Sequence, residues 1–306
     1  MRAFAGERWW VLALLAVTGL ALVAMSVMLA RRRDLGAGLV PARPGRPDAG
    51  PSLAGPTALA WRLQRGGLLG WAIAFTVAGV LFGTLAHSLG DIVGDNPQLT
   101  ALLAQIGGGT DELTDAFLTA ELSLLGLLAG GYACQATLRL RGEETELRAG
   151  PVLATAVGRR RWSVSHLGIA LGGSVVILAA GGLAAGLAHG LRIGEPAGQA
   201  ARMLGAALAQ APATWTLAGI AMLLFGLLPR LTALAWAVLL AFALLAQLGE
   251  LLQLDERITS LSPFAHVPQG LTQPVDAGPL LGLIAVTAAF LLAGLAAFQR
   301  RDLQES

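Results

Sequence analysis

Seven long apolar segments alternate with short polar segments along the 306-residue chain. Each apolar segment has roughly the 20 residues that an α-helix needs to cross a hydrocarbon core of about 30 Å. The segments are 9–30, 66–86, 117–138, 162–191, 203–228, 231–249 and 279–299. The pattern therefore predicts an all-α, polytopic membrane helical bundle of about seven transmembrane helices.

The composition agrees with this prediction and excludes several kinds of chemistry. Apolar residues make up 55% of the chain and charged residues only 13%, against about 25% charged in a soluble domain. All 21 basic residues are arginine, so the chain can form neither a Walker A loop nor a lysine Schiff base. The single cysteine, Cys134, excludes an internal disulfide and a multi-cysteine metal site. If the protein uses ATP, another chain must bind it.

The distribution of arginines predicts the orientation of the spans. If the N-terminus is outside and the seven spans alternate, 16 of the 21 arginines fall on the same side as the C-terminus. Arginine-rich loops stay in the cytoplasm, so we expect a cytoplasmic C-terminus and an outside N-terminus. The net charge of only +2 gives no reason to expect nucleic-acid binding.

A repeated tetrapeptide suggests how the chain is divided. Arg-Arg-Asp-Leu follows the first span at 32–35 and the last span at 300–303. Residues 1–35 are therefore expected to be the last span of a first unit, and residues 57–306 a six-span permease-like unit. Residues 36–56 between them are rich in proline and glycine, which predicts a cytoplasmic linker. On this interpretation the chain begins late in a larger two-unit architecture.

The sequence offers little for catalysis. No two of the four histidines are three or four residues apart, and no Gly-x-Ser-x-Gly elbow occurs. We therefore expect no enzymatic activity and no bound cofactor or metal on this chain.

Polar residues inside the apolar spans are candidates for a translocation path, because such residues are costly in a bilayer and usually face the interior of a bundle. Glu121 and Glu250 lie near the outer ends of their spans, so snorkelling to water is the alternative interpretation for both. The path candidates are Glu121, Gln135, Gln210, Gln247 and Glu250.

The polar loop between the third and fourth predicted spans, residues 139–162, is the most informative segment. Glu144 precedes Arg148 by four residues, the favourable order for an ion pair on a helix. Gly150 is expected to end that first short helix, and Pro151 suits the first turn of a second, apolar one. Three consecutive arginines close the loop.

Two interpretations of this loop remain open. Its arginines could hold an interfacial loop against anionic lipid. Its three closely spaced glutamates would oppose that contact, so a docking surface for a cytosolic protein is favoured.

The loop resembles the coupling segment of type-2 ABC exporter permeases, and is most similar to that of the actinobacterial, tetronasin-type exporters of polyketide antibiotics. The shared motif is a glutamate pair, an arginine-alanine step, a Leu-Ala-Thr turn and a final arginine-tryptophan. The matching residues here are Glu143, Glu144, Arg148, Ala149, Leu153, Ala154, Thr155, Arg161 and Trp162.

The resemblance implies the membrane-spanning permease subunit of an ATP-driven exporter in the bacterial plasma membrane. Such a subunit would move an apolar or amphipathic compound, such as a polyketide antibiotic, outward. Two copies of a separate cytosolic ABC ATPase would bind ATP and Mg²⁺. A second six-span unit would come from homodimerisation or from a separate N-terminal half. The implied docking residues are Glu143, Glu144, Arg148, Leu153, Thr155, Arg159 and Arg161.

Two alternatives belong to other functional classes. The chain could be a non-transporting membrane scaffold or sensor whose loop binds another cytosolic partner. It could also be an inactive C-terminal fragment of a larger permease.

Overall fold

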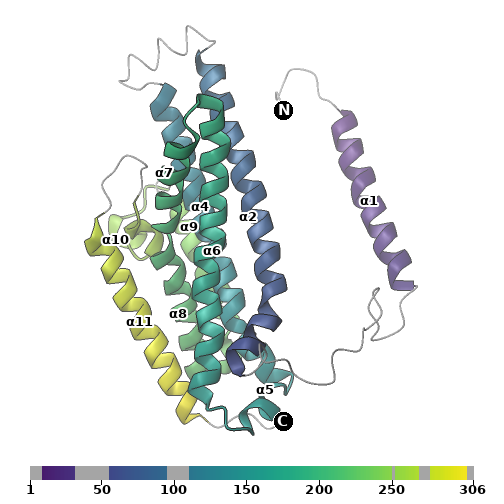
Figure 1. Ribbon diagram of the computed structural model, residues 1–306, viewed down its shortest axis with the longest axis vertical. Coiled ribbons are helices and arrows are strands. Elements are labelled where there is room, and N and C mark those ends of the chain that lie inside the picture. The colour runs from purple at the N-terminus through teal and green to yellow at the C-terminus, as the bar shows by residue number, and fades with distance from the viewer. Residues whose placement is uncertain (1–8, 32–54, 95–109, 250–251, 269–275, 302–306) are drawn as a thin grey trace. The chain divides into compact units, whose positions relative to one another are not determined.

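A computed structural model describes residues 9–31, 55–94, 110–249, 252–268 and 276–301, and all regular secondary structure in these ranges is helical (Figure 1). This confirms the predicted all-helical class. The α-helices are α1 (Trp9–Arg31), α2 (Pro56–Gly94), α4 (Thr110–Thr145), α5 (Ala149–Leu153), α6 (Arg159–Ile193), α7 (Pro196–Leu208), α8 (Ala211–Leu227), α9 (Leu234–Leu248), α10 (Glu256–Thr259) and α11 (Ala277–Arg300). Two 3₁₀ turns follow α8 and α10, at Pro229–Leu231 and Pro263–His266.

Within the described ranges, five of the seven predicted spans form helices long and apolar enough to cross a membrane. These five are α2, α4, α6, the α7–α8 pair and α11. The first and sixth predicted spans form the shorter apolar helices Ala16–Ala30, within α1, and Leu234–Leu248. The latter has 15 residues, which at 1.5 Å per residue is about 22 Å, less than the hydrocarbon core.

The chain divides into two compact units, Met1–Pro51 and Ser52–Ser306. The described part of the first unit is α1, in which large apolar side chains such as Leu14, Leu20 and Met25 are exposed. The second unit contains the remaining helices.

The fifth predicted span is interrupted near its start. α7 ends at Leu208 and α8 begins at Ala211 with Pro212 in its first turn. A proline is tolerated there because the first-turn N–H groups have no partner within the helix. The break places Gln210 at the junction, in the N-cap position of α8, where its side chain makes no capping hydrogen bond.

Glycines bring the helices of the second unit into two close pairs. A Cβ at Gly79 of α2 would overlap the carbonyl of Gly181 in α6, and a Cβ at Gly226 of α8 would overlap the carbonyl of Gly294 in α11. Small residues allow such close approach in membrane bundles. α4 packs against both α6 and α8, so it joins the α2–α6 pair to the α8–α11 pair.

Candidate functional site

The 142–162 segment connects α4 to α6. The expected short apolar helix is present as α5, which contains Pro151, whereas the expected charged helix is not a separate element. α4 continues through Thr145, so the charged stretch is the end of a long helix. The chain turns at Leu147, whose φ of 58° is left-handed. Gly150 lies inside α5 rather than ending a helix. The three arginines begin α6.

Glu143 is buried at the end of α4, with 5% of its surface exposed. Its carboxylate accepts hydrogen bonds from Nε of Arg139 and Nε of Arg148, both at 2.9 Å. Arg148 also pairs with Glu146. The expected Glu144–Arg148 helical pair is not formed, because α4 ends at Thr145 and Arg148 follows the turn.

Glu144 is also buried, with 6% of its surface exposed. Nη1 of Arg141 lies 3.3 Å from one carboxylate oxygen, and Nη2 of Arg301 donates to both oxygens at 2.9 Å. The carboxylates of the glutamate pair are therefore occupied by arginines of the same chain. Because these carboxylates are buried and neutralised, they do not present negative charge on the surface. They contribute to the surface only by holding the backbone around them in place.

The other predicted docking residues are divided between the surface and the interior. Thr155 and Arg161 are exposed, as is much of the Arg148 side chain. Leu153 is half-buried against an apolar cluster. Arg159 donates from Nη1 to the carbonyl of Arg301 at 2.5 Å. The docking role of these seven residues stays a prediction.

The four predicted path residues that the structure describes are divided between the interior and the surface. Glu121 and Gln210 are buried, with 4% and 2% exposed, whereas Gln135 and Gln247 are exposed. Glu250 lies outside the described residues. The burial of Glu121 contradicts snorkelling: both of its carboxylate oxygens are enclosed and have no hydrogen-bond partner among the described residues. Tight packing in the bundle keeps this side chain from reaching water.

A partly exposed stripe runs along one side of α4. Leu124, Leu128 and Gln135 are exposed, and the buried Gly131 lies between them on the same side of the helix. A Cβ at Gly131 would lie 3.6 Å from Leu239 in α9, and 3.9 Å from the indoles of Trp71 in α2 and Trp236 in α9. We call these four α4 residues the α4 face. Two tryptophans flank it.

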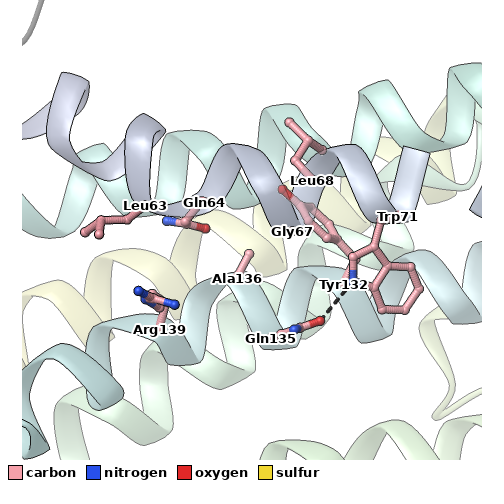
Figure 2. Close-up of a pocket in the computed structure, with 9 residues that line it drawn as sticks. All are labelled: Leu63, Gln64, Gly67, Leu68, Trp71, Tyr132, Gln135, Ala136 and Arg139. Carbon is pink, nitrogen blue, oxygen red and sulfur yellow. Dashed lines mark hydrogen bonds between the residues drawn. The ribbon is translucent and has the colours of Figure 1, made fainter. Parts of the chain in front are cut away.

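A shallow cavity of about 120 Å³ adjoins the α4 face toward the end that bears Arg139, between α2 and α4. Figure 2 shows the indole Nε1 of Trp71 donating to Oε1 of Gln135, at 2.9 Å, beside this cavity. Its lining residues are Leu63, Gln64, Gly67, Leu68, Trp71, Tyr132, Gln135, Ala136 and Arg139. The sequence analysis did not include the aromatic residues among the path candidates. Trp71 and Trp236 could have been included, because they are large amphipathic side chains inside predicted spans.

Among the described residues, no group of three histidine, cysteine or acidic side chains could hold a metal ion.

Two comparisons relate the chain to known proteins. Residues 53–299 match the family described as "Multidrug efflux system permease Rv1217c, C-terminal domain". Over 304 residues the chain is 43% identical to the multidrug efflux system permease protein Rv1217c of Mycobacterium tuberculosis (strain ATCC 25618 / H37Rv). The alignment includes 99% of this chain and 55% of the relative, so the chain spans about half the relative's length. Both matches support an efflux permease, and neither points to the tetronasin-type polyketide branch.

Proposed function

Because the chain belongs to the family of the multidrug efflux permease Rv1217c, through that family's C-terminal domain, we propose that it is the membrane-spanning permease subunit of an ATP-driven exporter. It moves apolar or amphipathic compounds, of which a polyketide antibiotic is one example, out across the bacterial plasma membrane. A separate ABC ATPase binds ATP and Mg²⁺, since this chain has no lysine for a Walker A loop.

The α4 face is the observation that best supports a transport path. A polar amide exposed on a membrane helix is costly when it faces lipid, and usually faces protein or a water-filled cavity. Gln135 is such an amide, and its hydrogen bond to Trp71 leaves its amide nitrogen available. Sites for amphipathic compounds combine apolar and aromatic walls with a few polar groups. The two tryptophans and Gln135 provide that combination.

The path needs a second wall opposite the α4 face. A second six-span unit supplies it, either as another copy of this chain or as a separate N-terminal half. The relative is nearly twice as long as the matched region, which is consistent with a two-unit architecture.

The 142–162 segment is where the ATPase docks. The ion pairs of Glu143 and Glu144 hold the turn at Leu147 and α5 in place. The contact surface is then formed by side chains that remain exposed on the segment, which include Glu146, Leu147, Pro151, Thr155 and Arg161. To switch the permease, nucleotide binding must favour one arrangement of the spans over the other by a few kcal/mol.

Transport into inside-out membrane vesicles tests this proposal. Vesicles containing the permease and its ATPase should accumulate a fluorescent amphipathic cation when ATP is added, and vesicles with either protein alone should not. The Gln135→Leu variant should reduce accumulation, whereas Leu69→Ala, on an exposed position of α2, should not. ATP-driven uptake by the permease alone would contradict the proposal.

A further inference from the structure

Arg301, the residue that follows α11, contacts both ends of the 142–162 segment. Its guanidinium binds the Glu144 carboxylate at the end of α4. Its backbone carbonyl accepts a hydrogen bond from Arg159 at the start of α6. Only 15% of the Arg301 side chain is exposed, so water competes little for these contacts.

The same guanidinium packs on aromatic rings of the α8–α11 pair. Its Cζ lies 5.1 Å from the ring centre of Phe225 in α8 and 5.3 Å from that of Phe298 in α11. These rings are 4.9 Å apart, and Trp162 of α6 lies 5.9 Å from Phe298. Stacking over aromatic faces adds to the attraction of the charge pair. One side chain therefore touches α4, α8 and α11 at once.

The connectivity of the bundle makes this contact mechanically important. The 142–162 segment is covalently continuous with α4 and α6 but not with α8 or α11. A displacement of the segment is transmitted to α4 and α6 through the backbone. At this end of the bundle, Arg301 and the aromatic cluster that it contacts are positioned to transmit the same displacement to the α8–α11 pair.

We propose that Arg301 is a positioning residue that fastens the α8–α11 pair to the 142–162 segment, so that both helix pairs move when the ATPase displaces that segment. The source of the displacement rests on the proposed function, whereas the link itself does not. The repeated Arg-Arg-Asp-Leu motif thereby gains a physical role in its second copy, since its second arginine is the residue that binds Glu144.

The link can be measured without any ATPase. Spin labels at Thr155→Cys and Gln299→Cys, both exposed positions, report the distance between the segment and the end of α11 in the full chain in lipid nanodiscs. The buried native cysteine is replaced by Cys134→Ala. The distance distribution should be narrow in this background, clearly broader with Arg301→Gln, and intermediate with Arg301→Lys.

Two matched variants make this test decisive. Arg300→Gln removes the same charge from the neighbouring, exposed residue of α11 and should leave the distribution narrow. Glu144→Gln removes the same ion pair from the other side and should broaden the distance distribution. This variant therefore tests the link even if Arg301→Gln does not fold. A narrow distribution in both Arg301→Gln and Glu144→Gln would overturn the link.

The mechanical role is tested with the permease and its ATPase in vesicles. Arg301→Gln should lower the amount of compound exported per ATP hydrolysed about tenfold, equivalent to about 1.4 kcal/mol, while ATP hydrolysis continues. Arg301→Lys should restore part of this ratio. An unchanged ratio together with a broadened distance would overturn the mechanical role and leave only a structural contact. Failure of the unmodified permease to transport would overturn the proposed function, while the distance measurement would still decide the link.

Discussion

Two glutamates on α4 are almost equally buried, yet their surroundings are opposite. Glu144, at the end of the helix, receives hydrogen bonds from Arg141 and Arg301. Glu121, more than 20 residues earlier in the apolar span, has no partner for either carboxylate oxygen in the part of the chain that the structure describes. A buried charge is tolerated when it is paired and costly when it is not. The charge of Glu144 is therefore compensated by its partners, whereas the enclosed carboxyl of Glu121 is retained at a cost.

The end of α4 and its membrane-spanning part therefore have different roles. Where α4 meets the 142–162 segment, arginines from three parts of the chain satisfy the acidic residues and hold the segment on the bundle. Farther into the bundle, Glu121 and the amide oxygen of Gln210 are buried without a hydrogen-bond partner among the described helices. Unsatisfied buried polar groups in native proteins need an explanation, and a role in function is one.

The largest effect on stability is expected from reversing the charge of Glu144, which is held in buried ion pairs. Glu144→Lys places a third cation beside Arg141 and Arg301, so the free energy of unfolding should fall by about 3–5 kcal/mol. Glu146→Lys makes the same change at a side chain that is 58% exposed, and should cost less than about 1 kcal/mol. Thermal unfolding in detergent measures both. Equal Tm values for the two variants would show that Glu144 is not held by its buried pairs.

An intermediate effect of opposite sign is expected at the unpaired glutamate. Glu121→Met replaces the carboxylate with an apolar chain of similar length and loses no hydrogen bond, so stability should be unchanged or rise by about 1 kcal/mol. Glu144→Met should instead lower it. If Glu121 serves transport, the more stable Glu121→Met variant should export less compound in the vesicle assay. A large loss of stability would contradict this expectation, because it would mean that the Glu121 carboxyl makes a stabilising hydrogen bond.

The smallest effect on stability is expected at the α4 face, where the substitution removes a single hydrogen bond. Trp71→Phe keeps an aromatic ring but removes the N–H that binds Gln135; because this hydrogen bond is exposed, its loss should cost no more than about 0.5 kcal/mol. Trp61→Phe makes the same change at an exposed position of the same helix and should have little effect. Dye transport and Tm measured together distinguish a path residue, which changes transport more than stability, from a packing residue.

Local chemistry was enough to predict much of the fold. The apolar segments form helices because any backbone in a bilayer must satisfy its own hydrogen bonds, and this holds whatever the neighbouring helices are. The break beside Pro212 follows from the missing N–H of proline, a property of one residue. These features could be read from the chain alone.

The partners of the polar residues could not be predicted in this way. The sequence suggested that Glu144 would pair with Arg148, four residues away, and its main partner is Arg301, 157 residues away. Gln135 meets Trp71 from a distance of 64 residues.

Sequence alone therefore determined the helical class and the approximate positions of the apolar helices, and tertiary structure decided which partners their polar side chains meet. The reason is physical. Helix formation depends on hydrogen bonds between residues four apart, whereas a long-range ion pair exists only once glycine crossings such as Gly226 with Gly294 have set the distance between helices.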